Sequence, residues 1–128
     1  MKKVSFDFDS TLDKGSVQEY ALELINKGFE VWICTSRTSP ENSNEGWNDD
    51  LFLVSDKLGI KRQNIIFTNY EDKSEHLNEK GFIWHLDDDW IELNQINKKT
   101  DLKGVSVFGN TKWKHKCNKI LNILPVNQ

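Results

Sequence analysis

The stretch that decides the fold is Val4-Ser5-Phe6-Asp7-Phe8-Asp9, a short apolar run that ends in carboxylates. An apolar run of this length predicts a strand buried in a sheet that is covered on both faces. Residues 17–25 follow with apolar side chains at helical spacing, and Gly28 is placed to end that helix. Together they predict the strand–helix unit of an α/β protein.

The same alternation continues along the rest of the chain. Further strands are expected at residues 31–34, 65–67, 82–86 and 105–108, and helices at 47–58, 71–80, 90–96 and 113–124. This order predicts a three-layer α/β Rossmann-like fold, with a five-stranded parallel sheet and helices on both faces. We expect residues 1–128 to form a single domain, because domains of about 100–150 residues are typical.

Composition limits the classes of function. The net charge of −3 argues against a dedicated nucleic-acid coat, which is usually strongly basic. Two cysteines cannot build a secreted disulfide framework, so Cys34 and Cys117 are expected to be reduced core residues. Asp7 and Asp9 interrupt the only stretch that resembles a signal peptide, and no apolar segment is long enough to span a membrane. We therefore expect a soluble, cytoplasmic protein.

Chemically active side chains follow nearly every predicted strand. In a parallel α/β sheet, ligands bind at the carboxyl ends of the strands. The residues at those ends are Asp7-Phe8-Asp9-Ser10-Thr11, Thr35-Ser36-Arg37, Thr68-Asn69 with Lys73 beyond, Asp87-Asp88-Asp89 and Gly109-Asn110. Carboxylates gathered in one cleft repel one another, and a divalent cation removes that cost. Ligands that are all oxygen favour a hard ion such as Mg²⁺.

Several of these residues also have a purely structural interpretation. Acids that follow strands often cap helices, and Asp89 fits that role, whereas Asp7 lies inside an apolar run and caps nothing. Taken singly, Lys73 could be a solvated helix lysine and Thr35 an ordinary β-branched residue at a strand end. His85 lies within a strand and is predicted to be a satisfied core residue.

The ordered set resembles a known family. Phe6-Asp7-Phe8-Asp9-Ser10-Thr11-Leu12 is similar to the first signature of the haloacid dehalogenase-like (HAD) phosphohydrolases, Asp-x-Asp-x-Thr after an apolar strand. The other three signatures are matched in order, and over nearly the whole chain, by Trp32-Ile33-Cys34-Thr35-Ser36, by Lys73 and by Leu86-Asp87-Asp88. Each motif alone is weak, but four in the family's order are specific.

The resemblance implies a Mg²⁺-dependent phosphomonoester hydrolase that works through an aspartyl-phosphate. Asp7 would be the nucleophile, and Asp9 would act as general acid and then as general base. Thr35 would bind phosphoryl oxygens, and Lys73 would steady the nucleophile and the developing charge. The implied Mg²⁺ ligands are Asp7, Asp88 and the backbone carbonyl of Asp9, with Asp87 in support; which of Asp87 and Asp88 binds directly stays open.

The segments between the signatures are too short for a cap domain, so we expect an open site. Thr35-Ser36-Arg37 is similar to a motif of polynucleotide 3′-phosphatase domains, and the second and fourth motifs are similar to those of small deoxyribonucleotidases. The expected partner is a phosphorylated substrate, either a nucleotide or a nucleic-acid phosphate end. Its candidate binding residues are Thr11, Ser36 and Arg37. Ser10 stands where many relatives have glycine, so the turn after the first strand is expected to be strained.

Alternative interpretations remain. A receiver-like phosphoacceptor would place an Asp after the third strand, where this chain has Thr68-Asn69. A non-enzymatic phosphate-binding module on the same scaffold is the other alternative. Trp47 is predicted to anchor its helix in preference to stacking on a base. Residues 112–119 form a basic cluster that fits a solvated helix face better than a nucleic-acid patch. The sequence does not decide between a monomer and a homo-oligomer.

Overall fold

The computed structural model describes residues 2–109 and 112–123, and within them five strands form one all-parallel sheet in the order β3-β2-β1-β4-β5. The strands are β1 (Lys3–Phe6), β2 (Glu30–Thr35), β3 (Ile65–Phe67), β4 (Phe82–Asp87) and β5 (Lys103–Ser106). The helices are α1 (Gly15–Asn26), α2 (Asp49–Leu58), α3 (Lys73–Leu77), α4 (Trp90–Lys99) and α5 (Lys112–Leu121). The predicted five-stranded parallel sheet is confirmed.

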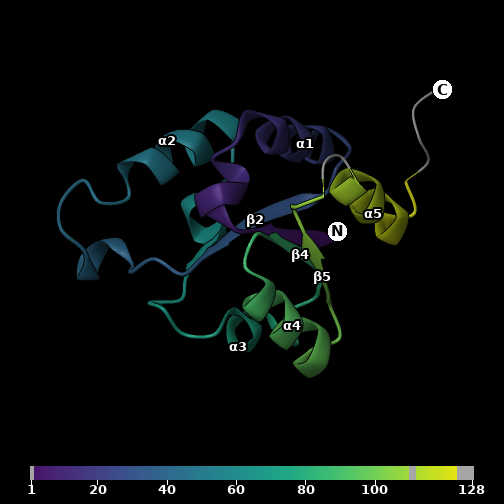
Figure 1. The fold of residues 1–128 in the computed structure, drawn as a ribbon. Helices are drawn as coiled ribbons and strands as arrows, with labels where there is room; N and C mark the ends of the chain where they lie inside the picture. The colour runs from purple at the N-terminus through teal and green to yellow at the C-terminus, as the bar shows by residue number, and fades with distance from the viewer. Residues whose placement is uncertain (1, 110–111, 124–128) are drawn as a thin grey trace.

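Helices cover both faces of the sheet, so the fold has three layers (Figure 1). Helices α1, α2 and α5 lie on one face, where Val4 and Phe6 of β1 belong to the larger hydrophobic core. Helices α3 and α4 lie on the other face, where Cys34 and Leu77 belong to a smaller core. Both cysteines are free and buried, as predicted. In β2 the successive residues Ile33 and Cys34 belong to the larger and the smaller core respectively, which is the alternation expected of a strand covered on both sides.

The central position of β1 brings distant parts of the sequence together. Phe6 is in register with Ile33 of β2 and with Leu86 of β4. The backbone N–H of Asp7 donates to the carbonyl of Leu86 at 2.9 Å. The carboxylates that follow β1 and β4 therefore lie next to each other, as expected because parallel strands have their carboxyl ends at the same edge of the sheet.

The connections at the carboxyl edge hold no inserted domain. A turn and α1 join β1 to β2, and residues 36–48 with α2 join β2 to β3, all in the part of the chain that the structure describes. The order 3-2-1-4-5 also differs from the 2-1-3-4-5 order of flavodoxin-like folds, which receiver domains share. The topology therefore disagrees with the receiver-like alternative.

The element boundaries differ from expectation in places. The helix predicted over residues 71–80 is only Lys73–Leu77, because Asp72 before it and Asn78 after it have extended backbone conformations. The fifth strand lies two residues earlier than predicted, at Lys103–Ser106. Asn110 and residue 124 lie outside the described residues. Among the helices that are described, none combines the length and hydropathy needed to cross a bilayer.

Candidate active site

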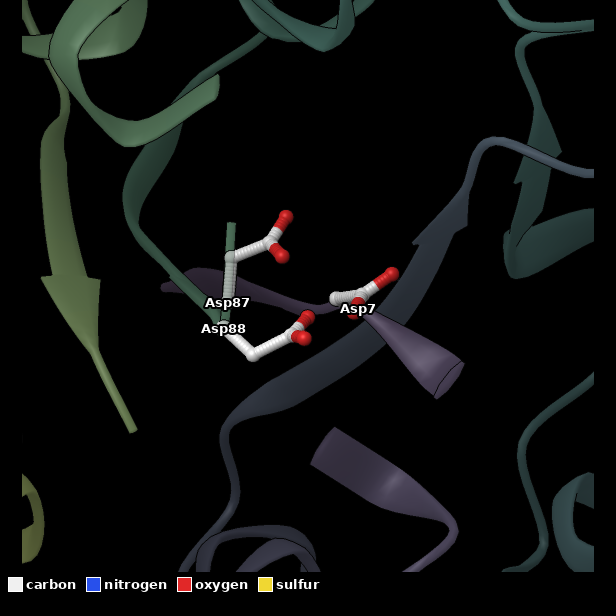
Figure 2. A group of neighbouring side chains, drawn as sticks. All are labelled: Asp7, Asp87 and Asp88. Atoms are coloured by element: carbon white, nitrogen blue, oxygen red, sulfur yellow. The ribbon is translucent and has the colours of Figure 1, made fainter. Parts of the chain in front are cut away.

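Three carboxyl groups meet at the carboxyl edge of the sheet. Asp7 directly follows β1, Asp87 ends β4 and Asp88 follows it, and one oxygen from each lies within 4.8 Å of the other two. Figure 2 shows these side chains gathered at the ends of the two adjacent strands. Asp7 and Asp87 are buried and Asp88 is partly exposed. A hard divalent cation prefers an oxygen-only donor set of this kind.

The ammonium group of Lys73 joins two of these acids. Its Nζ lies 2.7 Å from Asp7 Oδ1 and 2.6 Å from Asp87 Oδ2, and the side chain is only 2% exposed. Burial opposes the charge of the amine, but the two carboxylates outweigh it and raise the pKa of Lys73 above its usual range. Lys73 is thus a buried cation at the candidate centre, and the solvated-lysine interpretation is wrong.

Burial also sets the protonation of the predicted nucleophile. It raises the pKa of Asp7 to about 8, against the charge of Lys73 and with the help of the Asp87 carboxylate. Burial likewise raises the pKa of Asp88. The hydroxyl of Thr11 donates to Asp7 Oδ2 at 3.3 Å. Substrate binding by Thr11 stays a prediction.

His85 links the core to the site, which the sequence did not suggest. Its Nε2 lies 2.7 Å from Asp87 Oδ2, and its Nδ1 lies 2.9 Å from the hydroxyl of Ser5. Burial lowers the pKa of His85, which favours a neutral ring that donates from Nε2 and accepts at Nδ1. Burial alone would raise the pKa of Asp87, but the hydrogen bond from His85 and the charge of Lys73 hold it below its usual range.

The carboxylate of Asp9 does not join the cluster. It is 58% exposed and accepts two hydrogen bonds from Arg37, from Nη2 at 2.8 Å and from Nε at 3.1 Å. The same guanidinium donates to both oxygens of Asp50, at 2.8 and 3.0 Å. Hydrogen bonds from Arg37 hold the pKa of Asp50 below its usual range. Arg37 thus pairs with two carboxylates in this structure, and its role in substrate binding stays a prediction.

The remaining predicted residues surround the cluster. Thr35 is fully buried at the end of β2, and its Oγ1 accepts from the backbone N–H of Arg37 at 3.3 Å. The carbonyl of Ser36 accepts from the backbone N–H of Tyr70 at 2.8 Å. Ser10 has φ +60°, the left-handed conformation that a non-glycine residue adopts at a cost. The expected strain after the first strand is therefore present. The roles of these residues in binding or catalysis stay predictions.

Two structural interpretations had opposite outcomes. The backbone N–H groups of Ile91 and Glu92 donate to Asp89, which caps α4 as predicted. Trp47, in contrast, lies outside α2 and its side chain is 54% exposed, so it does not anchor the helix by burial. The buried residue next to it, Asn48, donates from Nδ2 to the carbonyl of Thr38 and ties the loop to the start of α2.

The fold and the site together define a three-layer α/β protein with a buried lysine–carboxylate centre at the carboxyl edge of its sheet. A solved structure from Vibrio cholerae, provisionally named a 3-deoxy-D-manno-octulosonate 8-phosphate phosphatase, has the same fold. The similarity covers 99% of this chain and 88% of that one, with a TM-score of 0.52 and 15% sequence identity. No family model and no curated protein matches the sequence. The similarity therefore shows the fold alone, which is the one that the motif resemblance implies.

Proposed function

We propose that this protein is a Mg²⁺-dependent phosphomonoester hydrolase that uses Asp7 as its nucleophile. The observation that carries the proposal is the cluster of Asp7, Asp87 and Asp88 at the carboxyl edge of the sheet, in which the buried Lys73 pairs with Asp7 and Asp87. Phosphoryl transfer needs chiefly positioned groups and electrostatic stabilisation. This cluster holds negative carboxylates and a positive ammonium group in fixed positions.

The residues present fit a divalent cation. With all three acids ionised, the carboxylates and the single ammonium of Lys73 leave two negative charges at the centre. A protonated Asp7 would be a poor nucleophile, and its pKa of about 8 without a cation means that it is mostly protonated at neutral pH. Bound Mg²⁺ would supply the charge that ionises Asp7 and neutralises the phosphoryl group. The three carboxylates would hold it.

The residues of the chain divide the chemistry between them. An oxygen of Asp7 attacks phosphorus, and the ester oxygen leaves and takes a proton from Asp9. Water then attacks the phosphorus of the aspartyl-phosphate, gives its proton to Asp9 and releases phosphate and free Asp7. Lys73 stabilises the charge on Asp7 throughout. Arg37 donates one hydrogen bond to each oxygen of Asp9, and the further lone pair on each oxygen remains for these proton transfers.

The test is hydrolysis of a generic aryl phosphate with and without Mg²⁺. We expect turnover that needs the cation and that falls by more than about 10³-fold in Asp7→Asn. Asp101→Asn, an exposed acid in the turn before β5, is the matched control and should retain full activity. Equal turnover by Asp7→Asn and the parent protein would refute the proposal. An acyl-phosphate that persists for minutes without turnover would favour the phosphoacceptor alternative.

The substrate class follows from the motifs and the open site. We propose a nucleotide or a nucleic-acid phosphate end, as the Thr35-Ser36-Arg37 motif indicates. The provisional name of the solved V. cholerae protein points instead to a sugar-acid phosphate, so that compound belongs in the substrate panel. Comparing kcat/KM across nucleoside monophosphates, phosphorylated oligonucleotides and sugar phosphates separates these classes.

A further inference from the structure

The exposed aromatic side chains of the described residues all lie beyond the carboxyl ends of the strands. They are Trp47, Tyr70, Trp90 and Phe108, which are 54–71% exposed and follow β2, β3, β4 and β5 respectively. The other exposed large apolar residues are aliphatic. Exposed apolar groups collected at one edge mark a contact surface, and aromatic rings favour planar ligands. A pocket that two of these rings share is therefore a candidate binding site for a planar ligand.

Two of these rings line one pocket. Trp47 and Tyr70 line a cavity of about 260 Å³, and its other lining residues are Thr38, Asn42, Ser43 and Asn44. Pockets for drug-sized ligands measure roughly 300–1,000 Å³, so this one suits a single small ring system. Its hydroxyl and amide groups can donate to and accept from the polar edge of such a ring.

Tyr70 lies in a turn with an unfavourable backbone conformation. Asn69 and Tyr70 have φ values of +54° and +65°, a left-handed pair that is costly for a bulky residue. Hydrogen bonds hold this turn against β2: the N–H of Asn69 donates to Arg37 O at 3.2 Å and that of Tyr70 to Ser36 O at 2.8 Å. These hydrogen bonds hold the turn that carries Tyr70 at the pocket.

Contacts connect the pocket to the proposed chemistry. The Arg37 guanidinium lies 5.9 Å from the centroid of the Trp47 ring, and it also forms an ion pair with Asp9. Asp9 is the residue proposed to protonate the leaving oxygen. The segments between β2 and α2 and between β3 and α3 extend from the same end of the sheet (Figure 1). The group attached to the leaving oxygen would therefore lie on the pocket's side of the site.

The negative charge of the loop that lines the pocket limits which chemical groups can bind there. The loop over residues 38–50 contains Glu41, Glu45, Asp49 and Asp50 but no lysine or arginine. Arg37 lies beside Trp47, but it already pairs with Asp9 and Asp50. A second phosphate or a carboxylate in the pocket would therefore meet the remaining acids of the loop, whereas an uncharged planar ring would not be repelled by them. This disfavours both a nucleic-acid strand and an anionic sugar.

We propose that the Trp47–Tyr70 pocket binds the nucleobase of a nucleoside monophosphate. The proposal rests on the phosphohydrolase function for the position of the phosphate, but base binding itself does not require catalysis. Two measurements therefore test the two proposals separately.

The first measurement uses nucleosides without phosphate. Adenosine and uridine are titrated into the ¹⁵N-labelled protein, and the Trp47 indole N–H, identified by its loss in Trp47→Ala, should shift while ribose causes no shift. Tyr70→Ala should weaken this binding, Tyr70→Phe should retain it because the ring is kept, and Trp90→Ala is the matched exposed-tryptophan control. Absence of a Trp47 shift with both nucleosides would overturn the pocket assignment, even in an active phosphatase.

The second measurement compares kcat/KM for adenosine and uridine 5′-monophosphates with that for ribose 5-phosphate. Stacking predicts that the nucleotide-to-ribose 5-phosphate ratio falls about tenfold in Trp47→Ala and in Tyr70→Ala but not in Trp90→Ala. A phosphorylated oligonucleotide that matches the mononucleotides, or an unchanged ratio in both pocket variants, would refute the inference. Base binding by a protein that hydrolyses none of these esters would instead refute only the proposed function.

Discussion

Binding of Mg²⁺ to the Asp7–Asp87–Asp88 cluster should release a proton, and the amount follows from the burial of Asp7. Burial raises the pKa of Asp7 to about 8 without a cation, so most Asp7 carboxyl groups hold a proton at pH 7. Because the cation binds the ionised acid, that proton must leave. The Mg²⁺ association constant should therefore rise about tenfold per pH unit from pH 6 to pH 7, and level off above pH 8.

The raised pKa of Asp7 also determines how the stability of the folded protein changes with pH. The folded metal-free protein holds the Asp7 proton at pH values where the unfolded chain, with a pKa near 3.8, has released it. The stability that Asp7 contributes is complete below pH 3.8 and is lost as the pH rises towards 8. Mg²⁺ should therefore stabilise the protein more at pH 8 than at pH 6, since it binds the ionised form.

Isothermal titration calorimetry in buffers of different ionisation enthalpy counts the released protons directly. Asp7→Asn should bind Mg²⁺ weakly and without this proton, whereas Asp9→Asn should release as much as the parent, since the Asp9 carboxylate lies outside the cluster. Tight Mg²⁺ binding at pH 6.5 with no proton release would refute the argument from burial. If Asp9→Asn released no proton on binding Mg²⁺, the assignment of the Mg²⁺ ligands would be wrong.

Three further predictions concern the parts that hold the site. Lys73→Met leaves Asp87 as an unpaired buried charge and should destabilise the protein by about 3–5 kcal/mol in urea unfolding, with much of the loss recovered in the Lys73→Met/Asp87→Asn double variant. Ser10→Gly relieves the left-handed backbone and should stabilise by up to about 1 kcal/mol; an unchanged melting temperature would contradict the strain. Arg37→Gln should cost about 1–2 kcal/mol and increase amide hydrogen exchange over residues 38–50, and unaltered exchange would mean that Arg37 does not order that loop.

The sequence predicted the sheet and the meeting of the acids because both depend on short-range patterns. Apolar runs mark buried strands, and a parallel sheet brings all its carboxyl ends to one edge. Asp7, Lys73, Asp87 and Asp88 could therefore be placed together before any side-chain position was known. The order of the residues in the sequence and the fold class are sufficient to predict that these four residues lie close together.

Pairings between distant side chains could not be predicted in this way. Arg37 lies 28 residues from Asp9 and 13 from Asp50, and nothing local selects these two among the 20 acidic residues. His85 and Ser5 meet because their strands are neighbours in this register, which apolar runs do not specify. A polar residue inside each of two buried strands was the available signal. It indicates a buried hydrogen bond but not its partner.

Stability alone does not account for the Lys73 cluster, and that favours a chemical role. Apolar residues of similar volume often replace a buried ion pair without loss of stability, because desolvation offsets the attraction between the charges. Here a lysine, two carboxylates and a neutral histidine occupy buried positions that apolar side chains could fill. They lie at the carboxyl edge of the sheet, beside the partly exposed acid Asp88 and the strained turn at Ser10. Fixed charges in such a place can act on an anionic substrate without reorganising, which is the property that phosphoryl transfer requires.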